Sequence, residues 1–439
     1  MKILFIENRY KTYFYAPIAK KLKEEGYEVH WLVQNKEFTP SSEFDYYRIN
    51  YPSKRFTRNK KDPGVEQVIE SDRQINHFGI NDTSYFYYYN EKIEEYLVRL
   101  KPDFVFGEST SFHELLTISN CRKHNFLYLN PSTSRYPIGR FAFYLYDTLE
   151  PYKGSGEVLS DDEAKTVVDQ IVQRKSKPDY MRLKSPSMAN KILDKTKKVV
   201  SFINGEKYNT PNPLVKYKIE KGKKAQIQEW DSIAEEKIDN NKNVKILYPL
   251  QMQPEANIDV WGRKYRNQTK LIKTISMSLP KDTLLYVKPN PKSKYELSAE
   301  LIDLVRSDKN IVPLAHNVKM DTVLPVMDMV ITVTGTIAIE CILSNKPVAT
   351  LIKTINNESP NCIYLKTLPN KLQNIVHSIK EGSFVQINES EKIKFVNRLN
   401  ATSYQGIVSD PFTDRNCLKQ SNIDAISKAF LEILKDKKN

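Results

Sequence analysis

Apolar residues in the first half of the chain fall into short β-branched runs separated by longer stretches with helical spacing. These runs predict strands at residues 2–6, 28–33, 102–106 and 126–129. Residues 17–25 are amphipathic and stop at Gly26, which favours a helix closed by a glycine cap. Strands that alternate with helices in this way are typical of a doubly wound parallel sheet.

An insertion at about residues 52–90 interrupts this alternation. It contains the basic segment 54–61, KRFTRNKK, and the aromatic run 85–89, YFYYY. Aromatic faces stack on sugar rings, but such a run equally serves as core, and both interpretations stay open. The basic segment is expected to be either a solvated loop or a contact with an anionic membrane. Residues 149–234 show weaker periodicity and are expected to hold surface helices and a linker.

The second half repeats the alternation and places polar residues directly after its strands. Predicted strands cover residues 246–248, 284–287, 330–333 and 348–351. The third is followed by Thr334-Gly335-Thr336 and then by a helical run that carries Glu340. Ligands of open parallel sheets bind beyond the carboxyl ends of the strands, and a helix that begins after a glycine turn suits a phosphate. Any βαβ unit also needs a tight turn, so a purely structural role for this glycine stays open.

Three strings in this half resemble the capsule-polysaccharide synthesis family. They are PLQMQPEA at residues 249–256, LYVK-x-x-P at residues 285–291 and VTGT…E at residues 333–340. Members of this family are bacterial glycosyltransferases of the GT-B kind, and many use CMP-activated ulosonic acids such as Kdo. The resemblance implies an α/β fold of two Rossmann-like, doubly wound domains that face a cleft. It also implies a C-terminal helix that crosses back to the first domain.

The resemblance further implies a donor site in the second domain that needs no cofactor and no bound metal. Thr334, Gly335 and Thr336 would meet the donor phosphate with help from Lys288, and Glu340 would bind the ribose. The other donor-binding positions are expected to be Gln253, Glu255 and Asn290.

Asn290 is a departure from the family pattern. Relatives usually have a histidine here that is thought to contact the donor phosphate, whereas this chain has an amide. Because an asparagine is never cationic, the donor sugar or its handling is expected to differ from that of the Kdo enzymes.

A catalytic base is expected at a strand end in the first domain, because glycosyl transfer must remove a proton from the acceptor hydroxyl. Glu108 directly follows the strand at residues 102–106 and is the first choice, with His113 and Asp72 as alternatives. Each has a structural alternative: Glu108 as a helix cap, His113 as a half-buried histidine, and Asp72 as the partner of an arginine. Arg135 and Arg140 suit a substrate carboxylate, unless they are ordinary surface arginines.

Length and composition are consistent with this interpretation. A chain of 439 residues exceeds the size at which one core keeps growing, so two domains are expected. The predicted division is 1–240 for an acceptor-binding domain, 241–420 for a nucleotide-sugar-binding domain and 421–439 for the crossover helix. The four cysteines are widely spaced, and neither a membrane span nor a signal peptide is apparent, so a cytoplasmic location is expected.

The formal net charge of +14 indicates a surface that attracts anions. Expected partners are a CMP-activated sugar, an acidic glycan or lipid-linked acceptor, and the inner face of an anionic membrane, rather than nucleic acid. The sequence therefore predicts a glycosyltransferase that moves an ulosonic sugar of the Kdo, sialic, pseudaminic or legionaminic type. The alternatives are a UDP-sugar transferase, a non-hydrolysing UDP-GlcNAc 2-epimerase, and a non-catalytic subunit of a capsule assembly complex.

Overall fold

The computed structural model describes residues 1–52, 61–182, 186–239, 243–293 and 295–435. The basic segment 54–61 therefore lies outside the described residues except for Lys61. The chain divides into two compact units: unit 1 holds residues 1–159, 177–216 and 397–439, and unit 2 holds residues 160–176 and 217–396.

This division differs from the expected one in where the chain changes unit. Helix α9 (Pro213–Ile233) carries the chain from unit 1 into unit 2, so the change falls inside a helix rather than near residue 240. Residues 160–176 were expected in the first domain but pack in unit 2, where helix α6 (Asp161–Val172) contacts helix α14 (Ile337–Leu343). Residues 397–420, expected in the second domain, return to unit 1.

Unit 1 is built on a seven-stranded sheet with the order β13-β6-β5-β4-β1-β2-β3. Strands β1 to β5 pair in parallel, whereas β6 pairs antiparallel with β5, and β13 pairs antiparallel with β6. The strands are β1 (Lys2–Ile6), β2 (Glu28–Val33), β3 (Asp45–Arg48), β4 (Phe104–Phe106), β5 (Leu127–Thr133), β6 (Arg140–Leu145) and β13 (Tyr404–Gln405).

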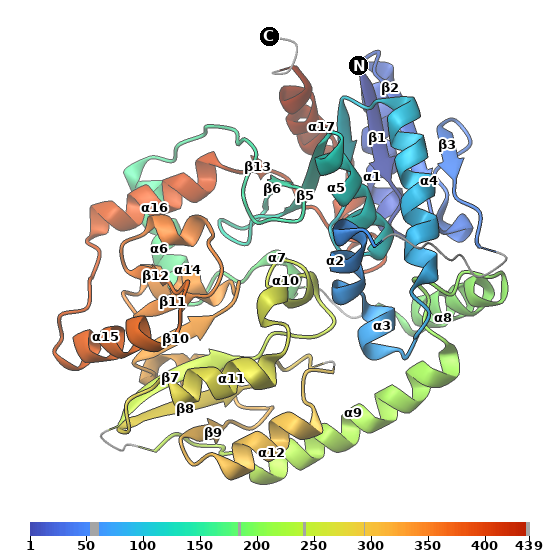
Figure 1. Cartoon of the computed structure of the whole chain (residues 1–439). Helices are drawn as coiled ribbons and strands as arrows, with labels where there is room; N and C mark the ends of the chain where they lie inside the picture. Colours follow the sequence, from blue (N-terminus) through green and yellow to red (C-terminus); the bar gives the residue numbers. More distant parts are fainter. Residues whose placement is uncertain (53–60, 183–185, 240–242, 294, 436–439) are drawn as a thin grey trace. The chain divides into compact units, whose positions relative to one another are not determined.

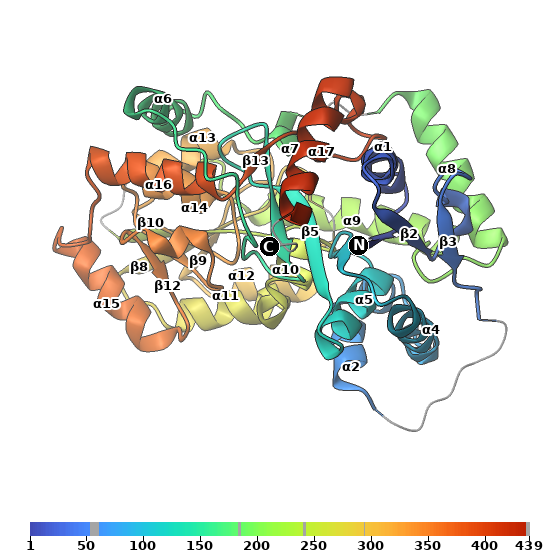
Figure 2. The same ribbon diagram turned by 90° about the horizontal axis from the view of Figure 1, so that it is seen from above.

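Helices cover both faces of this sheet (Figures 1 and 2). One face carries α1 (Lys11–Glu24) and α17 (Gln420–Lys435), which pack against each other. The other carries α2 (Pro63–Ser71), α4 (Ser84–Leu100) and α5 (Phe112–Lys123). The remaining helical segments are η1 (Lys36–Phe38), α3 (Arg73–His77), α7 (Asp179–Arg182), α8 (Met188–Ile203) and η5 (Arg415–Leu418).

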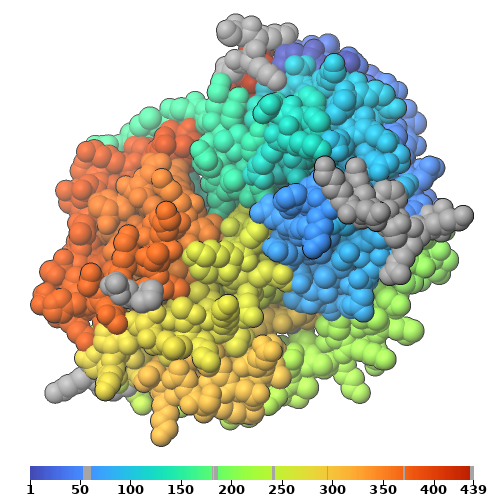
Figure 3. Space-filling view, in the orientation of Figure 1, coloured from blue at the N-terminus to red at the C-terminus, as the bar shows by residue number. Residues whose placement is uncertain are grey.

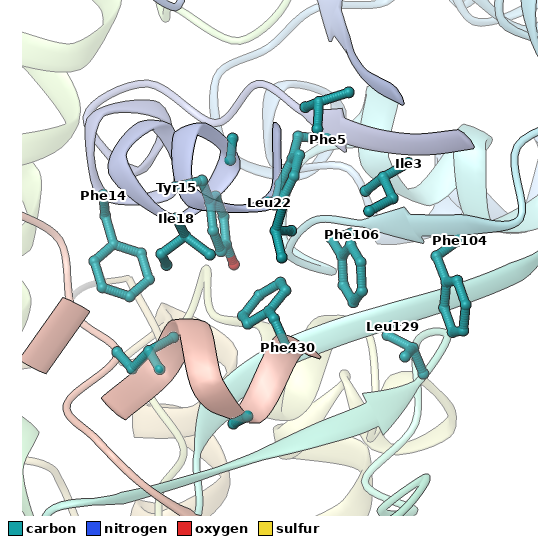
Figure 4. Packing of buried hydrophobic residues seen from close by; sticks show 14 of the residues in the cluster. Ile3, Phe5, Phe14, Tyr15, Ile18, Leu22, Phe104, Phe106, Leu129 and Phe430 are labelled. Carbon is teal, nitrogen blue, oxygen red and sulfur yellow. The ribbon is translucent and has the colours of Figure 1, made fainter. Parts of the chain in front are cut away.

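The C-terminal helix completes the core of unit 1, as predicted. Phe430 of α17 lies against Phe5 of β1 and Phe106 of β4, with ring centroids 6.1 Å and 4.7 Å away (Figure 4). Phe14 and Ile18 of α1 belong to the same buried cluster. Because several large side chains of α17 are fully buried, this helix stabilises the domain built by the first strands of the chain.

The aromatic run of the expected insertion belongs to the core and does not form a sugar-binding platform. It lies in α4, where Tyr85, Phe86 and Tyr89 are buried and pack around Phe112 of α5. Helical spacing explains this outcome, because residues 85, 86 and 89 project from the same side of a helix.

Unit 2 contains a six-stranded parallel sheet with the order β12-β11-β10-β7-β8-β9. Numbered 1 to 6 along the unit and read from β9 to β12, this is the 3-2-1-4-5-6 order of a Rossmann fold. The strand order reverses between β7 and β10. The strands are β7 (Val244–Pro249), β8 (Thr283–Lys288), β9 (Ile311–Pro313), β10 (Met329–Thr332), β11 (Val348–Thr350) and β12 (Cys362–Tyr364).

The core of unit 2 forms where apolar strand residues meet the surrounding helices. Ile246, Leu285 and Ile331 of the sheet are fully buried together with Ile272 of α11 and Trp230 of α9. The helical segments of the unit, besides α6, α9 and α14, are α10 (Ala256–Asp259), η2 (Arg263–Tyr265), α11 (Gln268–Met277), α12 (Ala299–Ser307), α13 (Met320–Val323), η3 (Leu324–Val326), η4 (Ile355–Glu358) and α15 (Pro369–Lys380), and α16 (Glu389–Ala401) leads back to unit 1. Two doubly wound α/β units confirm the predicted fold class.

Candidate functional site

The point of strand reversal in unit 2 brings together two of the three family strings. Strand β7 runs into the loop with Gln251, and β10 runs into Thr334-Gly335-Thr336. The two loops touch, because the Gln251 amide nitrogen lies 3.4 Å from the hydroxyl oxygen of Thr332. This is the edge at which open α/β sheets bind ligands. Gln251 and Thr332 were not among the predicted site residues, although both flank them in the sequence.

Gly335 occupies a position where a side chain would force its neighbours to shift. Its backbone N–H donates to Thr332 Oγ1 at 3.1 Å, and a Cβ added here would lie only 2.5 Å from the same oxygen. The close approach, rather than a positive φ, requires the glycine. Thr334 Oγ1 lies 3.4 Å from the carbonyl oxygen of Asn257, so the turn also touches the short helix α10 that follows the β7 loop. Hydroxyls and backbone N–H groups thus crowd the end of β10.

Gln253 stabilises the loop after β7 from inside. Its amide nitrogen donates to Asp259 Oδ1 at 2.8 Å and to the Arg266 carbonyl at 3.0 Å, and its oxygen accepts from Gln268 at 2.9 Å. The side chain is buried, so its expected contact with a phosphate or base is not supported by this geometry. Burial raises the pKa of the Asp259 carboxyl, while the bond from Gln253 opposes that shift.

Glu255 lies in the same loop at the start of α10. Its backbone N–H donates to Asp259 Oδ2 at 2.9 Å, and one carboxylate oxygen accepts from Asn257 at 3.3 Å. Its side chain is partly exposed, unlike that of Gln253.

Lys288 and Asn290 both stabilise the loop after β8. The buried Lys288 ammonium donates to the carbonyls of Pro289 and His316 at 2.8 and 3.1 Å. Burial lowers the pKa of Lys288 to about 8, while the negative charge of Asp231 opposes this shift. Asn290 accepts from the Lys292 N–H at 2.8 Å, which makes it the first residue of a turn. The two side chains were predicted to contact the donor, and in the structure both already bond to backbone groups.

Glu340 is buried in α14 and faces an arginine from far earlier in the chain. Arg174 Nη2 lies 3.4 Å from Glu340 Oε2, and Arg174 Nε lies 2.8 Å from Asp321 Oδ1. The arginine follows α6, the segment of residues 160–176 that joins unit 2. This pair was not predictable from the sequence, because 166 positions separate the two residues and nothing in the local pattern links them.

Strand order also reverses in unit 1, between β1 and β4, and the predicted base lies there. Glu108 follows β4, and its carboxylate forms an ion pair with Lys11 at 2.5 Å. Asn8, which follows β1, donates to Glu108 at 3.4 Å and to both oxygens of Glu114 at 3.0 Å. The Glu108 side chain retains 22% exposure, so its carboxylate is accessible from solvent.

Glu114, which the sequence did not single out, organises the loop that carries Glu108. Its carboxylate accepts from the backbone N–H groups of Glu108, Thr110 and Ser111 at 2.9, 3.2 and 2.9 Å. It is fully buried, and burial together with the nearby charge of Glu108 raises its pKa. The signal in the sequence was the spacing of Ser111 and Glu114, which forms a capping box at the start of α5. Glu108 is not the cap of this helix.

His113 and Asp72 have structural roles. The His113 ring is buried between the Glu7 carbonyl, 2.7 Å from Nε2, and the Asn209 amide, 3.0 Å from Nδ1, and burial lowers its pKa. A ring held at both nitrogens does not face a substrate. Asp72 is buried and caps α3 by accepting from the N–H groups of Gln74 and Ile75 at 2.8 and 3.1 Å. Burial raises its pKa to about 6.

Arg140 is a buried structural residue rather than a surface or substrate-binding arginine. Its guanidinium donates to the Ser403 hydroxyl and carbonyl, both at 2.8 Å, and to the Asn400 carbonyl at 3.2 Å. These bonds fix residues 400–403 of the returning segment beside β6. Arg135 lies in the loop after β5 with a positive φ of 75°. The predicted carboxylate-binding role of Arg140 is therefore not supported.

Two kinds of feature are absent from the described residues. No helix in that part of the chain combines the length and the apolar character that crossing a membrane requires. The same residues hold no group of three or more histidine, cysteine, aspartate or glutamate side chains arranged to bind a metal ion.

Comparison with known proteins supports the resemblance found in the sequence. Residues 162–357 match the family described as capsule polysaccharide biosynthesis protein. The match contains all three strings and both the β7 and β10 loops, and it begins in α6, so it also includes Arg174. The predicted resemblance to this family is thereby confirmed over this range. No curated protein matches the chain.

Solved structures align along most of the chain at low identity. A beta Kdo 2,7 transferase, KpsC, from Thermosulfurimonas dismutans is 8% identical, with 93% of this chain and 94% of that one covered and a TM-score of 0.39. UDP-GlcNAc 2-epimerase from Neisseria meningitidis bound to UDP-GlcNAc is 13% identical, with 99% and 100% covered and a TM-score of 0.24. MurG from Acinetobacter baumannii is 11% identical, with 91% and 96% covered and a TM-score of 0.26. All three TM-scores lie below 0.5, and the likenesses carry no argument about this chain.

Proposed function

We propose that this chain, whose residues 162–357 match the capsule polysaccharide biosynthesis family, is a glycosyltransferase that uses a CMP-activated ulosonic acid. The acceptor would be a surface polysaccharide or a lipid-linked glycan. One observation carries the proposal: family strings lie at the strand-reversal point of a Rossmann sheet, where Gln251 and Thr332 join the loops after β7 and β10.

In the proposed reaction, an acceptor hydroxyl attacks the anomeric carbon of the donor sugar. The bond from that carbon to the phosphate oxygen breaks, its electron pair stays on CMP, and the hydroxyl proton passes to a base. Hydroxyls and N–H groups at Thr334, Gly335 and Thr336 would receive the phosphate. Glu340, oriented by Arg174, would receive the ribose.

Glu108 is the proposed base, because it is the one predicted carboxylate in unit 1 that is both accessible and free of a capping role. Lys11 on one side and Asn8 on the other hold its carboxylate in place. Glu108→Gln keeps the shape and removes the proton acceptor. We expect turnover to fall about 100-fold or more while CMP affinity stays unchanged. Turnover near that of the native protein would exclude Glu108 as the base.

The decisive experiment is calorimetric titration of the full chain with CMP and with UDP, in the presence of EDTA. We expect CMP to bind more tightly, and Thr336→Val and Glu340→Ala to weaken it. His377→Ala is the matched control, because this residue is exposed on α15. Preference for UDP would point to a UDP-sugar transferase or epimerase. Binding of neither nucleotide would favour a non-catalytic capsule subunit.

A further inference from the structure

Helix α8 presents its apolar side outwards, the reverse of an ordinary surface helix. Four apolar side chains on this side are strongly exposed: Met188 by 75%, Ile192 by 56%, Leu193 by 66% and Ile203 by 76%. Val199 and Val200 are exposed on the same side. At 100° per residue, these six side chains fall within an arc of about 140°, which is a continuous apolar face. The helix lies at the surface of unit 1, in light green toward the right of Figure 3.

The polar side of α8 is the side that attaches it to unit 1. Lys197 Nζ lies 3.1 Å from the Tyr13 hydroxyl and 4.0 Å from the ring centroid of Phe38. Just after the helix, Asn204 donates to Glu37 at 2.9 Å. Ser201 is the buried residue of the helix. Contacts of this kind fix which side of the helix points away from the unit.

Basic side chains border the apolar face. Lys191 and Lys195 are exposed along one edge of it, and Lys207 is exposed just beyond the helix end. The acidic residues nearby are engaged within the unit: Asp194 pairs with Lys198 at 2.5 Å, and Glu206 is fully buried. An apolar face bordered by lysines complements a lipid surface with anionic headgroups, whereas a purely apolar partner would leave the lysines without counter-charges.

A pocket lies at one end of this face. It has a volume of about 570 Å³ and lies between α8, the start of α1 and the segment 411–418, with Leu193, Tyr10, Phe412 and Arg415 in its lining. Leu193 belongs both to the apolar face and to the pocket, and Tyr10 directly precedes Lys11, the partner of Glu108. A molecule embedded in the bilayer would therefore meet the pocket beside the helix.

We propose that α8 is an interfacial helix that seats unit 1 on an anionic bilayer surface. Its apolar side chains enter the boundary between headgroups and acyl chains, and Lys191, Lys195 and Lys207 contact the headgroups. This inference gives the proposed lipid-linked acceptor a route to unit 1, but it rests on the helix alone and holds for any activity of the protein.

The test is co-sedimentation of the full chain with vesicles of mixed phosphatidylglycerol and phosphatidylcholine, and with vesicles of phosphatidylcholine alone. We expect binding to the mixed vesicles only, weakened by added salt. The double variant Met188→Glu with Ile203→Glu should weaken binding about ten-fold or more. Met277→Glu is the matched control, because Met277 is equally exposed, at 76%, but lies on α11 of unit 2. Lys191→Glu should also weaken binding, whereas the exposed Lys428→Glu on α17 should not.

Undiminished binding by the double variant, or equal binding to neutral vesicles, would overturn the proposal. So would a native protein that sediments as a dimer and a double variant that sediments as a monomer, because a second copy would then cover the face. CMP titration of the double variant separates the interfacial-helix proposal from the proposed function. A protein that binds vesicles but no CMP would contradict the proposed function and leave the interfacial helix standing.

Discussion

Replacing Gly335 with alanine tests how tightly the turn after β10 is packed. The added Cβ would lie 2.5 Å from Thr332 Oγ1 and 3.3 Å from Ile337 Cγ2, whereas ordinary contacts are 3.4–4 Å. Thr332 is fully buried, and its hydroxyl accepts from the Gly335 N–H and from Gln251. The hydroxyl therefore moves only at the expense of these bonds.

The cost follows from two contributions. Overpacking of a close-packed site costs about 1–3 kcal/mol, and loss of a buried hydrogen bond costs about 1 kcal/mol more. We expect Gly335→Ala to destabilise unit 2 by about 2–4 kcal/mol, which lowers the Tm of a unit of this size by about 4–16 °C. Scanning calorimetry measures this shift. Gly222→Ala is the control, because a Cβ there meets nothing within 4 Å, and alanine is expected to stabilise helix α9 slightly.

A second substitution isolates the proposed contact. In a Thr332→Ala background, the oxygen that opposes the new Cβ is gone, so Gly335→Ala should cost at least about 1 kcal/mol less than in the native chain. Equal costs in the two backgrounds would refute the contact as the cause. A Tm within about 1 °C of the native value for the single variant would refute the packing argument itself.

Two further predictions concern buried charges. Because burial raises the pKa of Asp72 from 3.8 to about 6, the native state holds a proton that the unfolded chain has lost, and stability should fall as pH rises across that window. Asp72→Asn keeps a capping oxygen, so at pH 7 the variant should be more stable than the native protein, by at most about 3 kcal/mol. At pH 4 the two proteins should differ little. Thermal scans measure both differences, and a difference that does not change with pH would contradict the argument. Arg174→Met leaves Glu340 buried without its ion-pair partner, so it should lower the Tm of unit 2 and weaken CMP binding. Arg306→Met is the control, because Arg306 belongs to a partly exposed pair, and it should change neither quantity.

Local sequence was sufficient for the strands that border the candidate site and for the edge of the sheet that carries it. Strands β7, β8 and β10 lie within two residues of their predicted bounds, because each is a short buried apolar run that ends in polar or turn residues. Parallel pairing then places the ends of such strands on one edge. The order of the strands, and hence which two loops meet, is a property of the sheet that no single segment encodes.

The direction of individual polar side chains was not predictable in the same way. Gln253 and Arg140 are both polar residues near strand ends, and each was expected to meet a ligand. In the structure each bonds to partners inside the protein, and one partner of Arg140 lies 263 positions away at Ser403. A buried polar group must find a partner, so the nearest internal donors or acceptors decide where it points. Those neighbours are unknown until the fold is known.

Helix α8 shows the same limit for apolar residues. Periodicity reveals that one side of a helix is apolar, and the default inference is that this side is buried. Periodicity does not show which side of the helix packs against the unit, because the pattern is unchanged when the helix is rotated about its axis. Here the contacts of Lys197 with Tyr13 and Phe38 fix the rotation and turn the apolar side outwards. Weakening those contacts, for example by Tyr13→Ala, should allow the apolar side to roll inwards, and vesicle binding should then fall although no residue of the apolar face has changed.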